Sequence, residues 1–211
     1  MATGNQSVYE RHNVEMRGDG YSILKSERGR IFKATIGTGK RVVDLGCRDG
    51  ALTRSFLDGN TVTGADIDTV ALNKAAKLGI ETVQIDLHGD WHELGGRKFD
   101  AAVLAETLEH LYYPEQIIAK IADLLPDGGV LVGSVPNAFN LKNRLKLLLG
   151  IKRYTPLQDP THINHFTHAE LLGILRKHFR EVRIIPLGHY AALDRFWPGM
   201  FSFDMVFVCR K

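Results

Sequence analysis

The chain of 211 residues is long enough for one domain with a sizeable hydrophobic core and too short for two comfortable ones. Its 44% hydrophobic and 24% charged residues exclude an intrinsically disordered chain, and its net charge of +3 is too small to indicate nucleic acid binding by itself. No apolar run approaches the ~20 residues that a membrane-spanning helix needs.

Cysteine usage and the N-terminal residues indicate the compartment. Cys47 and Cys209 lie far apart in the sequence, which favours two reduced thiols over a disulfide framework or a metal knuckle. The first residues contain no apolar segment of the kind that a secretory signal needs. Both features predict a cytoplasmic protein.

The first two thirds of the chain alternate between strands and helices. Polar residues 1–20 predict a loose arm, and residues 21–36 predict a surface helix that ends at two glycines. Short apolar or β-branched runs predict strands at 41–45, 61–65, 81–85, 99–105 and 130–135. Helices are expected between them at 51–57, 69–78 and 114–125.

The last third departs from this alternation. Residues 137–166 form an insertion, with a helix expected near 139–149, and Thr167 with Glu170 forms a capping box at the start of a helix over 167–178. Two strands without an intervening helix follow, at 182–185 and 205–209. Residues 21–211 therefore predict a single α/β domain with a doubly wound seven-stranded sheet, helices on both faces and an antiparallel last strand.

The glycine loop of residues 44–50 follows the first strand. Ligands of open α/β sheets bind at the carboxyl ends of the strands, where glycines let the backbone approach them closely. The loop lacks the G-x-G-x-x-G spacing, and Asp44 stands where it would repel a pyrophosphate. This disfavours a dinucleotide and favours a ligand with an ammonium group.

Two further acids end the next two strands. Asp66 lies about twenty residues after Gly46, where a carboxylate accepts hydrogen bonds from ribose hydroxyls. Asp86 ends the third strand, where it is placed to accept from an adenine amino group. Each acid alone is also typical of a solvated loop or a helix cap, but three at successive strand ends favour one nucleoside site.

Five segments together resemble the class I S-adenosylmethionine-dependent methyltransferases, over about residues 20–210. These segments are VVDLGCRDG (42–50), VTGADID (62–68), VQIDL (83–87), FDAAVLAETLEHL (99–111) and LLPDGGVLVGSVPN (124–137). The resemblance implies a Rossmann-like sheet and S-adenosyl-L-methionine as cofactor. It places Asp44, Gly46 and Gly50 around the methionine moiety, Asp66 on the ribose, and Asp86 and Leu87 beside the adenine. The full set of expected cofactor residues is Asp44, Gly46, Arg48, Gly50, Asp66, Ile67, Asp86, Leu87 and Glu106.

Arg48 departs from this resemblance, because the family usually has glycine there. Its side chain is expected to point to solvent or toward the cofactor carboxylate. Because of this departure, the sequence is also compatible with a protein that binds the cofactor but does not catalyse methyl transfer.

Glu106, Glu109 and His110 follow the fourth strand. If they form one helical turn, their side chains share one face and present two carboxylates and an imidazole. Such a set binds Mg²⁺, Mn²⁺ or Zn²⁺, and a metal there would lower the pKa of an acceptor hydroxyl. The cluster is similar to the metal-binding one of ubiquinone-biosynthesis O-methyltransferases and small-RNA ribose 2′-O-methyltransferases. Without a metal, the acids are a helix start and His110 shapes the pocket or acts as general base.

The insertion is expected to contribute the residues that bind the substrate. Residues 139–151 mix apolar and basic side chains, which predicts either a lid facing a phosphate, a carboxylate or a membrane surface, or an ordinary cover helix. Residues 159–167 resemble the D-P-x-H-x-x-x-F-T segment of methyltransferases of polysaccharide, glycolipid and other small-molecule pathways. His162 in this segment is a second candidate catalytic histidine, beside an ordinary loop histidine as the alternative.

We therefore expect a methyltransferase that acts on an oxygen of a small molecule, glycan or lipid-linked acceptor. An RNA ribose 2′-O-methyltransferase ranks lower, because a larger basic surface would be needed, and a non-catalytic cofactor-binding relative is the third alternative. A dehydrogenase ranks last because of the glycine spacing. Nucleic acid is not an expected partner, peripheral membrane contact is compatible with the insertion, and the oligomeric state is not indicated.

Overall fold

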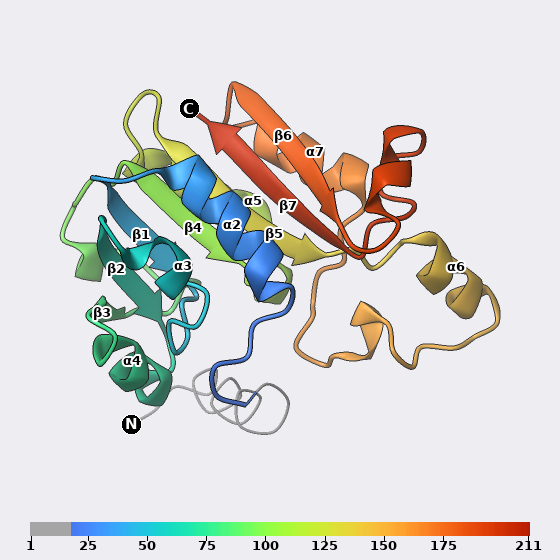
Figure 1. The fold of residues 1–211 in the computed structure, drawn as a ribbon, viewed down its shortest axis with the longest axis horizontal. Coiled ribbons are helices and arrows are strands. Elements are labelled where there is room, and N and C mark those ends of the chain that lie inside the picture. Colours follow the sequence, from blue (N-terminus) through green and yellow to red (C-terminus); the bar gives the residue numbers. More distant parts are fainter. Residues whose placement is uncertain (1–17) are drawn as a thin grey trace.

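The computed structural model describes residues 18–211, and its central feature is one seven-stranded sheet (Figure 1). The predicted arm of residues 1–20 thus lies outside the described residues except for its last three. The strand order is β3-β2-β1-β4-β5-β7-β6. The strands are β1 (Arg41–Leu45), β2 (Thr61–Asp66), β3 (Glu81–Gln84), β4 (Ala101–Ala105), β5 (Val130–Pro136), β6 (Glu181–Leu187) and β7 (Asp204–Arg210).

The sheet is parallel except at its last strand. β1 pairs in parallel with β2 and β4, and β7 runs antiparallel to both of its neighbours, β5 and β6. The carboxyl ends of β1, β4 and β5 therefore meet at one edge, where the amino end of β7 joins them through the pairing of Pro136 with Asp204. The predicted doubly wound sheet with an antiparallel last strand is confirmed.

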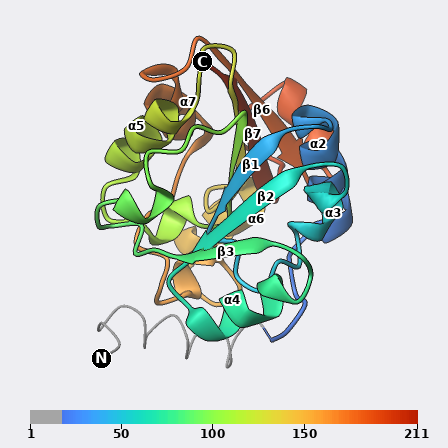
Figure 2. The ribbon, with the colours of Figure 1, turned by 90° about the vertical axis from the view of Figure 1, so that its left-hand side faces the viewer.

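Helices cover both faces of the sheet (Figure 2). α2 (Lys25–Ile36), α3 (Arg54–Leu57) and α4 (Thr69–Ala76) pack on one face, and α5 (Pro114–Leu124) and α7 (His168–Arg176) pack on the other. Successive strand residues face opposite layers, so that Val42 packs with α2 whereas Val43 packs with α5. The apolar runs of the central strands are thus explained by burial on both sides.

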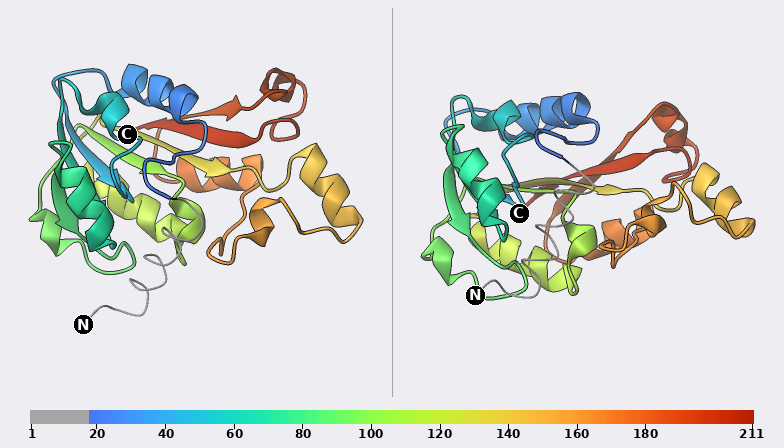
Figure 3. Two further views of the ribbon diagram at one scale, coloured as in Figure 1. Left: turned by 60° about the horizontal axis from the view of Figure 1, so that its bottom comes forward. Right: turned by 90° about the horizontal axis from the view of Figure 1, so that it is seen from below.

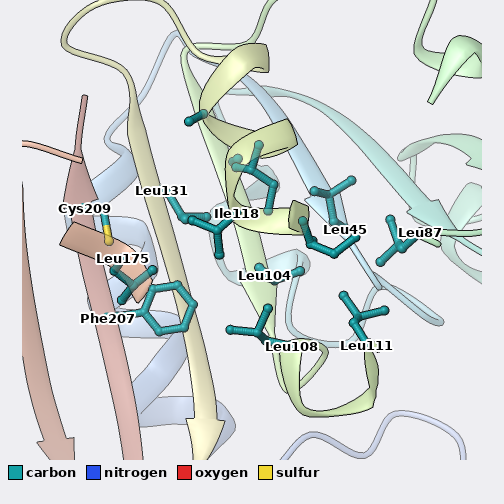
Figure 4. Packing of buried hydrophobic residues seen from close by; sticks show 14 of the residues in the cluster. Leu45, Leu87, Leu104, Leu108, Leu111, Ile118, Leu131, Leu175, Phe207 and Cys209 are labelled. Atoms are coloured by element: carbon teal, nitrogen blue, oxygen red, sulfur yellow. The ribbon is translucent and has the colours of Figure 1, made fainter. Parts of the chain in front are cut away.

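The core beneath α5 and α7 is made mainly of large aliphatic side chains, with four phenylalanines that include Phe207 (Figure 4). Ile118 of α5 and Leu104 of β4 are fully buried in it. Each such side chain contributes about 1.5–3 kcal/mol by leaving water. This layer holds the ends of β1 and β4 in fixed positions.

Several elements are shorter than predicted. α2 begins four residues later than the expected helix, and α3 covers only the end of the expected helix 51–57. The reason is the loop before α3, in which Gly50 has a φ of 75° and Ala51 donates to the Asp49 carboxylate. Residues 18–211 also contain four short 3-10 helices that were not predicted, because a single turn has too few residues for a hydrophobic period. They are η2 (His92–Leu94), η3 (Leu108–His110), η4 (Pro156–Gln158) and η5 (Ala191–Arg195).

The predicted insertion connects β5 to α7. It holds α6 (Leu141–Leu148) and η4, and it extends beyond the end of the sheet (Figures 1 and 3). The predicted capping box of Thr167 and Glu170 is present at the start of α7. Among the described residues, no helix is long and apolar enough to cross a membrane.

Candidate active site

A cavity of about 340 Å³ opens at the carboxyl ends of β1, β4 and β5. Its walls come from the end of β4, helix α2, the insertion, the start of β7 and the glycine loop that follows β1, which we call the β1 loop (residues 44–50). Its charged and imidazole side chains include Arg28, Asp44, Arg48, Glu106, His162 and Asp204. Of the expected cofactor residues, Asp44, Gly46, Arg48 and Glu106 line this cavity.

The β1 loop brings its backbone close to β4. Gly46 has a φ of 81°, and a Cβ at this position would collide with the Thr107 hydroxyl, so the close approach requires glycine. Asp44 is buried beside this loop and accepts a hydrogen bond of 2.7 Å from the Thr53 hydroxyl. Burial raises the pKa of Asp44 to about 7. A ligand cation in the cavity would favour its ionised form.

Arg48 was expected to point to solvent or toward a cofactor carboxylate, and in the structure it contacts the backbone of residues 18–21 instead. Its guanidinium donates to the carbonyl oxygens of Gly18 and Tyr21, and its side chain is 14% exposed. Asp49 accepts a hydrogen bond of 2.7 Å from the Gly20 amide. These two side chains therefore hold residues 18–21 against the β1 loop, beside the cavity that Tyr21 helps to line.

Asp66 ends β2 with its carboxylate already engaged by backbone. Its Oδ2 accepts from the Arg48 amide at 2.8 Å and its Oδ1 from the Asp68 amide at 2.9 Å. Burial raises the pKa of Asp66, and these two amides oppose that rise. Each carboxylate oxygen has a second lone pair, so the group retains the capacity to accept from a ligand.

The remaining expected cofactor residues continue along the same edge. Asp86 accepts from the His88 amide and lies 3.0 Å from the His88 ring, and Leu87 beside it is buried. Asp66, Ile67, Asp86, Leu87 and Gly50 are not among the residues that line the 340 Å³ cavity. Their role toward a ligand stays a prediction.

Arg28 is a site residue that the sequence analysis missed. Its side chain is 1% exposed, and Nη1 donates to Ser134 at 2.8 Å and lies 3.4 Å from Glu106. Asp204 lies 4.0 Å from the Arg28 Nε, and burial together with the charge of Glu106 raises its pKa, against the effect of Arg28. Helical spacing could have indicated its burial, since Arg28 lies on the same face of α2 as the buried Phe32 and Ile36.

The expected grouping of Glu106 with Glu109 and His110 requires one helical turn, which does not form. Glu106 has a φ of 51° and the 3-10 turn begins only at Leu108. The Glu106 carboxylate therefore points to Ser134, which donates to it at 2.8 Å, and toward Arg28. In the structure, the residue that lies next to Glu109 and His110 is His162 and not Glu106.

Glu109, His110 and His162 form this cluster, which we call the carboxylate–histidine cluster. One potential ligand atom from each lies within 4.8 Å of the others. Nε2 of His110 lies 3.8 Å, and Nε2 of His162 3.9 Å, from Oε1 of Glu109. The rings of the two histidines are 4.8 Å apart, edge to face.

Backbone carbonyls set the orientation of both histidines. Nδ1 of His110 lies 2.9 Å from the Thr161 carbonyl oxygen, and Nδ1 of His162 lies 3.0 Å from that of Pro156. A carbonyl oxygen only accepts, so both Nδ1 atoms carry a proton, and in the neutral form of each ring the lone pair lies on Nε2. Such carbonyl contacts are typical of histidines that bind metal ions or accept protons.

Comparisons with known proteins agree with this architecture. A family described as a methyltransferase domain matches residues 16–178. The ubiquinone biosynthesis O-methyltransferase of Burkholderia thailandensis is 33% identical over 154 residues, which cover 65% of this chain and 66% of the relative. The protein of the same name from Burkholderia multivorans is 32% identical over 171 residues, covering 74% and 73%. The chain thus spans about two thirds of the length of these curated relatives.

A solved structure shows the same fold. A methyltransferase from Archaeoglobus fulgidus that depends on S-adenosylmethionine superposes with a TM-score of 0.68 at 18% identity, covering 96% of this chain and 99% of that one. The family match, which spans most of the chain, and the glycine loop at the end of β1 lead to the same conclusion. The chain belongs to the S-adenosylmethionine-dependent methyltransferases.

Proposed function

We propose that the protein transfers the methyl group of S-adenosylmethionine to a hydroxyl oxygen of a small-molecule, glycan or lipid-linked acceptor. One observation carries this proposal: the β1 loop and His162 line the same cavity. A cofactor held by the loop and an acceptor beside the imidazole would therefore meet there. The names of the relatives with 32–33% identity support an oxygen acceptor.

Residues of the cavity, together with strand-end residues that lie outside its lining, would bind the different parts of the cofactor. Asp44 would face the ammonium of the methionine moiety, and Arg28 is the buried cation that lines the cavity near Glu106. Asp66 would accept from the ribose hydroxyls, with Asp86 and Leu87 beside the adenine. Methyl transfer needs the sulfonium and the oxygen in line, so this positioning would supply most of the rate enhancement.

His162 would remove the acceptor proton. As the oxygen–methyl bond forms and the sulfur–methyl bond breaks, the hydroxyl proton passes to Nε2 and later to solvent, leaving S-adenosylhomocysteine and the methyl ether. Nε2 of His162 lies 3.9 Å from Glu109 and 3.6 Å from Asp159, so the imidazolium would form between two carboxylates. His110 lies behind it, edge to face.

As an alternative to a general base, the carboxylate–histidine cluster fits a divalent cation, since the one lone pair on Nε2 of His162 binds either a proton or a metal. Two imidazole nitrogens and one carboxylate favour Zn²⁺ or Mn²⁺ over Mg²⁺, which prefers oxygen ligands. A bound cation would supply a Lewis acid that lowers the pKa of the acceptor hydroxyl. Glu109, His110 and His162 would hold it, whereas Glu106 is held by Ser134 and Arg28.

Calorimetric titration of Zn²⁺ and Mn²⁺ into the metal-free protein tests this site. We expect one bound cation, and loss of at least about tenfold in affinity in Glu109→Gln and in His162→Asn. Glu93→Gln, an exchange outside the cluster, is the matched control. Equal affinity in the control and in both cluster variants would contradict the site and leave His162 as a base without a metal.

A turnover assay tests the proposed activity. The purified protein is incubated with S-adenosylmethionine and separate phenols, catechols and monosaccharides, and release of S-adenosylhomocysteine is measured. We expect at least one hydroxylated acceptor to give turnover that His162→Asn reduces by roughly 10²-fold or more. Transfer to amines alone would contradict an oxygen acceptor, and full activity of His162→Asn would remove it as the base.

A further inference from the structure

Helix α6 exposes leucines to solvent and buries an asparagine. Leu148 and the following Leu149 are 82% and 74% exposed, whereas Asn143 is the residue that the helix buries, at 6% exposure. Helices on the surface of a domain ordinarily bury their apolar face and expose their polar one. Among residues 18–211, no element covers the leucine face.

Polar contacts fix α6 in this orientation. The side chain of Asn140 caps the helix by accepting from the Asn143 amide, and the Asn143 side chain donates to the Asn137 carbonyl at 3.2 Å. The Leu141 amide donates to the Met200 carbonyl at 2.7 Å. The helix is thus attached through its polar side, and Leu141, Leu145 and Leu148 are exposed to solvent.

The exposed leucines form one stripe with basic flanks. Leu141, Leu145 and Leu148 are spaced by four and three residues, which places them on one face of the helix. All three are exposed, and Lys142 and Arg144 lie on either side of the stripe. Residues 139–158 contain five basic side chains and no acidic one.

Aromatic side chains lie at the same end of the molecule. Phe196 and Trp197 follow η5 and are 72% and 63% exposed. Figure 1 shows η5 and α6 beyond the same end of the sheet, and the contact between Leu141 and Met200 joins the two segments. Exposed Trp beside leucines and basic residues is typical of surfaces that lie in the membrane interface.

We propose that the leucine stripe of α6, with Phe196 and Trp197, docks on the surface of an anionic lipid bilayer. The leucines and aromatic rings would enter the boundary between headgroups and acyl chains, and the basic residues of 142–153 would contact anionic headgroups. Charge favours this occupant over a protein groove, since the stripe is flanked by like positive charges that an apolar groove would leave unpaired.

The docking face continues into the cavity wall. Tyr154, Thr155 and Pro156 follow it directly and line the cavity. Docking would therefore bring the acceptor side of the cavity to the bilayer, where a lipid-linked acceptor is found; this last step rests on the proposed function. The docking itself requires no turnover and is measured without it.

Co-sedimentation with vesicles tests the proposal. The full chain is mixed with vesicles of phosphatidylcholine alone or with phosphatidylglycerol, at low and high salt. We expect binding to the anionic vesicles that weakens with salt, and a loss of at least about tenfold in Leu148→Glu/Leu149→Glu. Lys142→Glu/Lys152→Glu should lose binding to vesicles with phosphatidylglycerol but not change binding to vesicles of phosphatidylcholine alone. Val70→Glu changes an apolar residue that is 58% exposed on α4 and should bind like the wild type.

Three results would overturn the proposal. The first is equal binding of the wild type to both kinds of vesicle, and the second is unchanged binding of Leu148→Glu/Leu149→Glu. The third is a dimer in solution that this variant abolishes while vesicles bind neither protein, which would make the stripe a protein interface. Thermal unfolding of each variant checks the fold, and the unchanged cofactor affinity of the variants separates this test from that of the proposed function.

Discussion

The two sides of the cavity are built in opposite ways. On the β1 side, charged groups are buried and held by backbone or neighbouring side chains: Asp44 by Thr53, Asp66 by two amides and Arg28 by Ser134. On the insertion side, residues 154–156 line the cavity, and α6, which lies outside the cavity lining, exposes leucines to water and attaches to the domain through asparagines. The first side is preorganised for one ligand, whereas the second is shaped for a partner larger than the cavity.

This difference has a thermodynamic consequence. Removing one partner from a buried charge cluster leaves the others uncompensated, which costs several kcal/mol, while a change on an exposed helix affects stability little. Substitutions of these buried charged groups on the β1 side should therefore reduce both stability and cofactor binding. Substitutions on α6 should reduce partner binding alone.

The largest effect is expected at Arg28. Arg28→Met would leave Glu106 and Asp204 close together without their cation, so we expect a loss of about 3–5 kcal/mol in the free energy of unfolding. Urea unfolding followed by fluorescence measures it. The double variant Arg28→Met/Glu106→Gln should recover part of the loss, because one of the two acids is then neutral. A loss below about 1 kcal/mol would show that the cluster does not depend on the arginine.

A pH dependence of cofactor binding should follow from Asp44. Its pKa is about 7 in the free protein, so it becomes protonated as the pH falls through 7, and the neutral form no longer attracts an ammonium group. The affinity for S-adenosylhomocysteine should therefore fall about tenfold from pH 8 to pH 6. Asp44→Asn should bind more weakly and with a flat profile. An identical slope in this variant would assign the titration to another group.

The smallest effect is expected at Arg48. Arg48→Gly suits the positive φ of 51° at this position and restores the glycine of the family, but it removes the contacts to the carbonyls of Gly18 and Tyr21. We expect the fold to persist and the cofactor affinity to stay within a factor of about three. Amide exchange at residues 18–23 should accelerate. A tenfold loss of affinity would instead make Arg48 a ligand of the cofactor.

The strand ends on the β1 side were predictable because a continuous apolar run followed by a glycine loop has one interpretation in an α/β sheet. Asp44, Asp66 and Asp86 accordingly lie at or just after the ends of β1, β2 and β3. Arg28 was not predictable, since its partners Ser134 and Asp204 lie more than a hundred residues away in the sequence. Sequence spacing carries no sign of such a distant contact.

The cluster after β4 shows a second limit. A spacing of three and four residues suggested one helical face, but the left-handed conformation of Glu106 turned its side chain away from Glu109. His162 entered the cluster from a loop held by the carbonyl of Pro156. For α6, the sequence did predict a helix with apolar and basic residues, but the direction of its leucines follows from the burial of Asn143, which only the structure shows.

One calorimetric comparison tests the division of the cavity most directly. S-adenosylhomocysteine is titrated into the wild type, Asp66→Ala and His162→Asn at pH 8. Asp66→Ala loses a charged acceptor worth about 1.5–3 kcal/mol, so its affinity should fall roughly tenfold to a hundredfold, while His162→Asn should stay within about twofold of the wild type. Unchanged affinity in Asp66→Ala, or an equal loss in both variants, would contradict a cofactor held on the β1 side and an acceptor held on the other.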